Sequence, residues 1–584
     1  MTHINPFSRV GRVLHYHGEP VYLAGKYPGT PQAGIDALPD IDYGPVMRQH
    51  AALRNNFLRH WIIPYWLYSG PGNAYSPFHR RDDGTWNVAR FNDDYFRRLG
   101  NMVRAANLHG IVVQLTIFDT SGLEAGAGRW AINPYNDLRN VNSFVRPLAK
   151  DDSADGVPAF YDLAIPGLSD AQKGLVDRVV DATVGSWNVI YEIMNEVHSG
   201  IEPADADFDD AARAALRRTR VKWLDAVTGW IDARTGGSRL VFHNDYTAPA
   251  QSASDVVFWK RNATTYPGYA KLDGVTLHND PRLVDPEAPR YADFNGEKVF
   301  QVSTDAYGGP RDDFAWNRET TRIAFARKMI FQAETVHPDA GRGIGQAAPS
   351  PTDLRLGRFT HLFRTSGPNQ PRLDMRFFVN DALGFYITYS PAAPFGEMGR
   401  GRVEDFRFTG ETQEIRLYTR NGNTTDWWRY AFAGETLTLV NTRTSLTLTL
   451  QRIRRAPVEA LVPFLYNWQR VWVSNTTQHF EMRFDVDGAA RTFRRAPAYQ
   501  EIDYHDVRSV TPAGETSGSM VFYNFLDGRL RTYRYAFEGG GARLRLTNTE
   551  NNVQQLFERR DWFIPPSSLA VAAPAGSALE AAGV

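Results

Sequence analysis

The clearest chemical signal in the sequence is an Asn–Glu pair at the end of a buried strand. The apolar run at 187–194 leads directly into Asn195 and Glu196. A carboxylic acid at a strand end, beside an apolar wall, can have its pKa raised and then protonate a leaving group. Asn195 could hydrogen-bond a substrate hydroxyl. Glu192 shares the strand face of Glu196 about two pleats deeper, and we expect it to form a buried ion pair.

The elements that must position this pair alternate along residues 1–366. Short apolar runs predict seven strands, at 20–25, 57–63, 111–118, 187–194, 239–243, 273–278 and 298–304, and an eighth is predicted near 343–347. Amphipathic segments predict helices at 92–109, 169–184, 216–235, 318–334 and 354–364. Alternating strands and helices imply a parallel sheet, and eight strands fit a (β/α)8 TIM barrel with functional groups at the carboxyl ends. A doubly wound open sheet is the competing architecture, although no Gly-rich phosphate loop follows an early strand.

The pattern changes after residue 366 to short alternating strands, and this region repeats internally. The motifs that start at Met375, Tyr430 and Leu437 recur in the same order at Met482, Tyr535 and Leu544. A repeated order of motifs predicts two tandem all-β modules, each a sandwich or a small barrel. We place them at 367–456 and 457–563. Residues 564–584 are rich in Ala, Pro, Ser and Gly and predict a disordered tail.

The overall composition excludes several classes of partner. Lys+Arg and Asp+Glu both number 65, which gives a formal net charge of zero. We therefore expect no nucleic-acid partner and no binding to an anionic membrane. The chain has no cysteine, which excludes disulfides, Cys-ligated metals and a thiol nucleophile. No apolar run approaches the ~20 residues that a bilayer requires.

Two further features concern the compartment and metals. The first residues lack the charged start and apolar run of a signal peptide, so we expect an intracellular protein or one whose leader has been removed. His15 and His17 share a strand face, as in some metal sites, but no third ligand is evident. We predict no metal and no cofactor.

The segment 10–366 resembles the clan A glycoside hydrolases, which are retaining β/α-barrel enzymes related to the family 5 cellulases and mannanases. The resemblance rests on a fourth strand ending in Asn195 and Glu196, a second strand that contains Arg59, and the start at 17–25. It implies that Glu196 is the general acid/base and that Asn195 contacts the sugar 2-hydroxyl. It also implies that Arg59 supports the nucleophile.

The sequence departs from this clan after its seventh strand. The clan has a nucleophilic Glu there, whereas this chain has Asp305, and Glu297 lies before the strand, at the wrong barrel end. Retaining chemistry needs carboxyls ~5–5.5 Å apart and inverting chemistry ~6.5–9.5 Å. We predict Asp305 as the second catalytic group. The alternative is a carboxylate that caps the turn before the glycines at 308–309.

Other polar and aromatic residues at strand ends fit a sugar-binding site. Aromatic faces suit the apolar faces of pyranose rings, and carboxylates and imidazoles suit hydroxyls. We predict that the substrate-binding residues are Arg59, Asp119, Trp130, Asn195, His243, His278, Tyr307 and Trp316. For any single one of them, a structural role is an equal alternative.

These expectations converge on a glycoside hydrolase that acts on a carbohydrate substrate. Glu196 would protonate the glycosidic oxygen and Asp305 would attack the anomeric carbon, with net retention. Arg59 and His278 would help to hold the nucleophile. The alternative is a non-hydrolytic glycan-binding protein on a degenerate hydrolase barrel. A third hypothesis is a structural or interaction protein that acts through its β modules.

Overall fold

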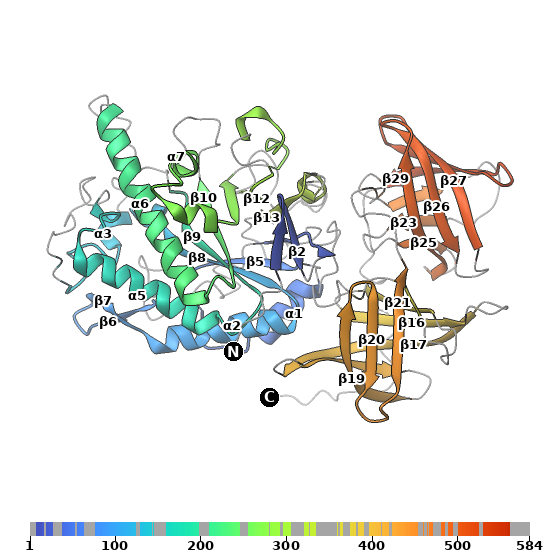
Figure 1. Cartoon of the computed structure of the whole chain (residues 1–584), viewed down its shortest axis with the longest axis horizontal. Coiled ribbons are helices and arrows are strands. Elements are labelled where there is room, and N and C mark those ends of the chain that lie inside the picture. Colours follow the sequence, from blue (N-terminus) through green and yellow to red (C-terminus); the bar gives the residue numbers. More distant parts are fainter. Residues whose placement is uncertain are drawn as a thin grey trace, which may run out of the picture. The chain divides into compact units, whose positions relative to one another are not determined.

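The computed structural model divides into two compact units, Met1–Phe359 and Thr360–Val584, and each is described by itself (Figure 1). In the first unit it describes residues 7–16, 19–26, 38–52, 55–63, 76–123, 129–142, 144, 159–197, 210–245, 255–278, 281–291, 296–304, 320–325, 327–333 and 359. In the second unit it describes residues 362–365, 374–380, 383–390, 396–409, 412–419, 423–453, 460, 464, 467–470, 480–484, 489–494, 500–524 and 529–560.

The first unit is built on a closed barrel of eight parallel strands. They are β4 (Ala24–Lys26), β5 (Phe57–Trp61), β8 (Val112–Asp119), β9 (Val189–Asn195), β10 (Leu240–Asp245), β11 (Gly274–His278), β12 (Val299–Thr304) and β13 (Met329–Ala333). The barrel closes where β13 pairs with β4, with Phe331 opposite Ala24. The predicted (β/α)8 fold is confirmed, and the open doubly wound sheet is excluded.

The prediction of the eighth strand was wrong. We expected it near 343–347, which lies outside the described residues, and assigned 318–334 to a helix. In the structure β13 occupies part of that segment, and all five of its residues are buried. A strand buried on both faces loses the apolar–polar alternation, so periodicity does not distinguish it from a buried helix. The helix expected at 354–364 is also wrong at its end, where β14 (Leu362–Thr365) forms.

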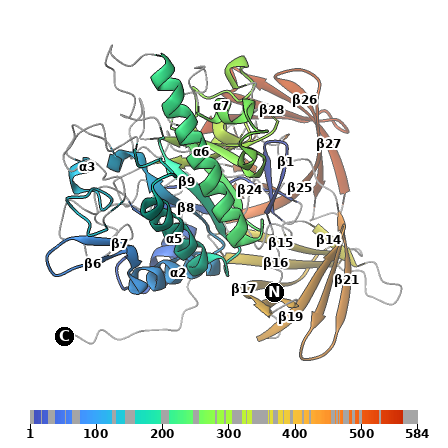
Figure 2. The same ribbon diagram turned by 60° about the vertical axis from the view of Figure 1, so that its left-hand side comes forward.

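Helices pack around the outside of this barrel. The longer ones are α1 (Gly44–Ala52), α2 (Asp93–Leu108), α5 (Pro166–Thr183), α6 (Asp210–Thr235) and α7 (Asp255–Arg261). The side chain of Asn92 accepts a hydrogen bond from the Tyr95 amide and caps α2, as predicted. Helices α5 and α6 run side by side, and α6 contacts β9 (Figure 2). The amphipathic helices therefore shield the outer face of the strands that carry the Asn–Glu pair.

A small antiparallel sheet closes the amino-terminal end of the barrel. It consists of β1 (Phe7–Val10), β2 (Val13–Tyr16) and β3 (Glu19–Pro20). Its apolar side chains form one core cluster with the first residues of several barrel strands: Phe7, Leu14, Tyr16, Phe57, Val112 and Val299. Because this end is plugged, the carboxyl ends of the strands are the end at which a ligand can be bound.

The described part of this unit also contains three short 3-10 helices, one short α-helix and a two-strand ribbon. They are η3 (Thr120–Leu123), η4 (Pro267–Lys271), η5 (Pro289–Tyr291), α3 (Arg129–Ile132) and the pair β6 (Phe78–Arg80) and β7 (Trp86–Phe91). Of these, η3 follows β8 directly and therefore lies at the carboxyl end of the barrel.

The second unit contains two closed antiparallel barrels of eight strands each. The first is made of β14, β15 (Asp374–Asn380), β16 (Leu383–Ser390), β17 (Gly396–Thr409), β18 (Thr412–Thr419), β19 (Thr424–Ala433), β20 (Thr436–Asn441) and β21 (Thr447–Ile453). The second is made of β22 (Asn467–Arg470), β23 (Phe480–Phe484), β24 (Ala489–Arg494), β25 (Gln500–Pro512), β26 (Ser517–Asn524), β27 (Arg529–Glu538), β28 (Arg543–Asn548) and β29 (Gln554–Arg560). In both, each strand pairs with its neighbours along the chain, which makes them up-and-down barrels. The all-β modules are thus small barrels, not sandwiches.

The repeated motifs occupy equivalent strands of the two barrels. Met375 and Met482 lie on the second strands, β15 and β23, and Tyr430 and Tyr535 on the sixth, β19 and β27. Both fourth strands carry a bulge at corresponding places, after Val403 in β17 and after Val507 in β25. The sequence repeat is therefore a repeat of structure. The predicted tail at 564–584 lies outside the described residues.

The turn after the seventh strand of each module offers a matched test of local strain. Ser445 has a φ of +59° and its equivalent Asn552 a φ of +57°. Asn tolerates this left-handed conformation, whereas for most non-glycine residues it costs roughly 1–2 kcal/mol. We expect Ser445→Gly to stabilise the first module by about 0.5–1 kcal/mol, and Asn552→Gly to change the second by much less. Thermal unfolding of the full chain measures both, and an equal gain at the two turns would contradict the explanation.

Candidate active site

Polar side chains from four adjacent strands meet at the carboxyl end of the parallel barrel. Asp119, Asn195 and His278 are the last residues of β8, β9 and β11, and Asn244 is the last but one of β10. In the parallel register Asp119 lies opposite Asn195. Glu196 follows β9 directly. The barrel therefore brings together four of the predicted site residues that lie on three separate segments of the chain.

Three neighbours fix the amide of Asn195. Its Oδ1 accepts hydrogen bonds from Arg59 Nη2 at 2.7 Å and from Asn244 Nδ2 at 2.9 Å. Its Nδ2 donates to Asp119 Oδ1 at 3.1 Å. A guanidinium group has donors only, so the amide oxygen must be the atom that faces Arg59. Among the described residues, the second N–H of Asn195 has no hydrogen-bond partner and can bind a ligand, whereas its oxygen already accepts twice.

Glu192, which lies deeper in the barrel than Asn195, binds the guanidinium of Arg59. Arg59 Nε donates to Glu192 Oε2 at 2.8 Å, and Nη2 lies 2.7 Å from the same oxygen. Both side chains are 0% exposed. The buried ion pair expected for Glu192 is confirmed. Thr116 adds a second partner, because its Oγ1 donates to Glu192 Oε2 and accepts from Arg59 Nε at 3.1 Å.

Glu196 stands at a strained turn of the chain after β9. Its φ is +51°, a conformation that costs a non-glycine residue about 1–3 kcal/mol and that recurs at active sites. Its side chain is 12% exposed, and its Oε1 contacts Nδ1 of His278. This contact is an ion pair when the imidazole is protonated, and it restricts the orientation of the carboxyl. The carboxyl is therefore held in place yet partly accessible, as a group that exchanges protons with a ligand must be.

Asp119 is a second carboxyl in the same cluster, and it is 4% exposed. Its Oδ1 accepts from Asn195 and from the Ser121 amide at 3.1 Å, while its Oδ2 has no hydrogen-bond partner among the described residues. Burial raises the pKa of Asp119 to about 6, although the hydrogen bond from Asn195 opposes the shift; the nearby Glu196 carboxylate adds to the rise. Asp119 thus changes charge close to neutral pH.

Two of the predicted substrate-binding residues lie elsewhere. His243 is fully buried and meets the ring of Trp259 of α7 edge-on, with centroids 6.4 Å apart, so it belongs to the layer between barrel and helices. Successive strand residues point to opposite faces, and it is Asn244 that reaches the site. Trp130 in α3 is also fully buried and offers no ring face to a sugar. Both side chains therefore pack inside the protein in this structure.

The structure leaves the other assignments open. Asp305, Tyr307 and Trp316 lie outside the described residues. Sequence reasoning missed Thr116 and Ser303. The Oγ of Ser303 accepts from Arg59 Nη1 at 3.5 Å. The available signal was polar residues at alternate positions of otherwise apolar strands, which indicates side chains that point into the barrel.

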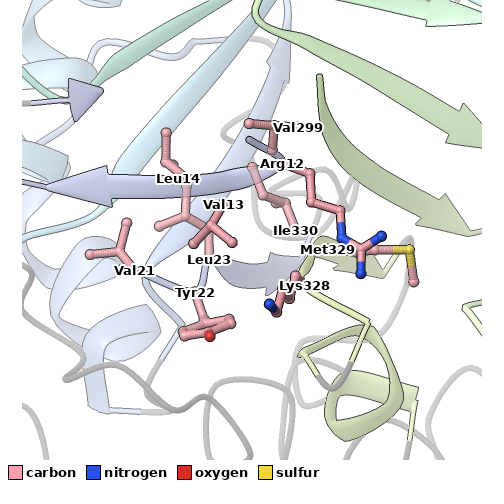
Figure 3. Close-up of a pocket in the computed structure, with 10 residues that line it drawn as sticks. All are labelled: Arg12, Val13, Leu14, Val21, Tyr22, Leu23, Val299, Lys328, Met329 and Ile330. Carbon is pink, nitrogen blue, oxygen red and sulfur yellow. The ribbon is translucent and has the colours of Figure 1, made fainter. Parts of the chain in front are cut away.

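A pocket lies at the opposite end of the barrel (Figure 3). Its lining includes Leu14 and Tyr22 from the amino-terminal segment and Val299 and Met329, the first residues of β12 and β13. In β/α barrels the working groups lie at the carboxyl end, so we assign this pocket no part in catalysis.

Within the described ranges, no group of three or more His, Asp or Glu side chains is arranged to hold a metal ion. Among the helices that the structure describes, none has the length and apolar character needed to cross a membrane.

No protein-family model matches the sequence, and no curated protein matches it. Solved structures similar to this chain include glycoside hydrolases. ZgEngAGH5_4 in complex with a cellotriose is 12% identical, with 55% of this chain covering 95% of that one at a TM-score of 0.34. A GH5 xyloglucan-specific endo-beta-1,4-glucanase from a metagenomic library, in complex with cellotriose, is 11% identical (52% and 86% covered, TM-score 0.28). Xylanase10C from Cellvibrio japonicus, in complex with xylopentaose, is 12% identical (56% and 67% covered, TM-score 0.33). At such low identities and TM-scores, the likeness concerns the fold alone and carries no argument about activity.

Proposed function

We propose that the chain is a glycoside hydrolase with Glu196 as its general acid/base. The observation that supports this most is the setting of Glu196. It is partly accessible at the carboxyl end of a parallel barrel, oriented by His278, and flanked by polar side chains of the two preceding strands. A carboxyl that is fixed and yet reachable can give a proton to a glycosidic oxygen and later take one from water.

In the proposed reaction, the second group is Asp305, which the chain order places after β12. Glu196 protonates the leaving oxygen while Asp305 attacks the anomeric carbon, which forms a glycosyl-enzyme and breaks the glycosidic bond. Glu196 then takes a proton from the water that hydrolyses this intermediate, and the anomeric configuration is retained. The second N–H of Asn195, which has no partner in the part of the chain that the structure describes, binds an oxygen of the sugar. An uncharged polyhydroxylated substrate agrees with a chain of zero net charge.

The test is hydrolysis by the full chain. The protein is incubated with neutral polysaccharides, among them β-1,4-glucan, xyloglucan and xylan, and with aryl β-glycosides, and reducing ends are counted. We expect release of reducing ends, and NMR of the first product should show the anomer of the substrate. Inversion would contradict Asp305 as nucleophile. Binding without product would favour the non-hydrolytic alternative. The absence of both binding and product would refute the proposal.

A further inference from the structure

We propose that the buried Glu192–Arg59 ion pair is a positioning device that sets the Asn195 amide as an N–H donor toward a substrate hydroxyl. The inference rests on the proposed function and adds Glu192 to the groups on which recognition of the sugar depends. Glu192 is 0% exposed, so it acts through Arg59 and not by touching the substrate.

One guanidinium group joins the carboxylate to the amide. Arg59 Nη2 lies 2.7 Å from Glu192 Oε2 and donates to Asn195 Oδ1, also at 2.7 Å. Arg59 Nε adds a bond to the same Glu192 oxygen at 2.8 Å. Two bonds to one carboxylate fix the plane of the guanidinium, and that plane in turn fixes the position of the Asn195 amide.

Of the three described groups bonded to the Asn195 amide, Arg59 alone has a constant hydrogen-bond polarity. The Asn244 amide could rotate and offer its oxygen instead of its nitrogen to Asn195. Asp119 accepts when ionised, but its burial brings the pKa to about 6, so at lower pH it also carries a proton to donate. A guanidinium always donates and keeps its charge. Without Arg59, the Asn195 amide could therefore turn its oxygen toward the substrate.

Stability alone does not explain a fully buried ion pair. Two charges lose their hydration on burial, and replacement of such pairs by apolar residues of similar volume is often neutral or stabilising. This chain contains a second pair of the same kind, which serves as a matched control. Arg220 of α6 and Asp255 of α7 are both 0% exposed, with bonds of 2.7 Å and 3.2 Å. That pair lies among the helices outside the barrel strands.

The experiment replaces each pair in the full chain, as Arg59→Met/Glu192→Leu and as Arg220→Met/Asp255→Leu. Two substrates are compared, the aryl β-glycoside that the wild type cleaves best and its 2-deoxy analogue. The readout is kcat/KM on the first substrate divided by kcat/KM on the second. Intrinsic reactivity cancels when this ratio is compared between variants. We expect the ratio to fall about tenfold in the first variant, with the loss mainly in kcat, because one hydrogen bond to the hydroxyl is misdirected. The control variant should keep the wild-type ratio.

A second variant guards against misfolding. Glu192→Gln keeps the shape and an acceptor oxygen for Arg59, and it should lower the ratio about threefold by loosening the guanidinium. An unchanged ratio in both Glu192 variants, or an equal fall in the Arg220/Asp255 control, would overturn the inference while leaving the hydrolase proposal intact. If the wild type cleaves no glycoside, both proposals fail.

Discussion

The Glu196→Gln variant is expected to hydrolyse glycans about 10²–10⁴-fold more slowly than the wild type, which is the usual contribution of general acid–base catalysis. Glutamine fills nearly the same volume, and its amide oxygen can still contact His278. It has no proton to give to the leaving oxygen. The melting temperature should therefore stay within about 2 °C of the wild type, since neither a cavity nor an unpaired charge is created.

Substrates with different leaving groups distinguish the loss of a proton donor at residue 196 from a general loss of substrate binding. A phenolate leaving group needs little protonation, so activated aryl glycosides should lose less activity than polysaccharides. The control is Glu297→Gln, because Glu297 precedes β12 at the other barrel end and pairs with Lys260 at 2.9 Å. It should leave kcat/KM unchanged. Equal loss in the two variants, or full activity of Glu196→Gln on every substrate, would exclude the assigned role.

The strand that carries the candidate acid could be predicted because its pattern is local. Residues 187–194 are apolar except for Asn188 and Glu192 and are followed by a polar pair, which is typical of a parallel strand buried on both faces. The same property misled us at β13, because Met329–Ala333 follows a helical segment at 320–325 and no Gly, Pro, Asn or Asp marks the border. A local pattern gives the type of a long element more reliably than the border between two short ones.

The contacts of the site could be predicted only in part. The chain order showed that Asp119, Asn195 and Glu196 come at strand ends, so their proximity followed from closure of the barrel. It did not show that Arg59 joins Glu192 to Asn195, because that depends on which strand faces point inward and on the stagger between strands. The error at His243 has the same origin. Neighbouring residues of β10 point to opposite faces, so an error of one residue selects His243 in place of Asn244 as the side chain that points into the barrel.

The Asp119→Asn variant is expected to be more stable than the wild type at neutral pH. Burial raises the pKa of Asp119 from 3.8 to about 6, so the folded protein binds this proton more tightly than the unfolded chain does. Ionisation of Asp119 therefore lowers the free energy of unfolding. This loss grows as the pH rises from about 4 to about 6 and is constant above. The neutral amide avoids it, and the gain at pH 7–8 should approach about 3 kcal/mol. Below about pH 4 the two proteins should be equally stable.

A gain in stability with a loss of activity would mark Asp119 as a functional residue. Asparagine keeps the acceptor for Asn195 and Ser121 but removes the charge beside Glu196, so we expect kcat/KM to fall about tenfold or more. The control is Asp273→Asn. Burial also raises the pKa of Asp273, which lies at the other barrel end and accepts from the Val241 amide at 3.0 Å. That variant should gain stability in the same direction and keep full activity. Thermal unfolding from pH 4 to pH 8 measures the gain, and a difference independent of pH at Asp119 would contradict burial of its charge as the cause.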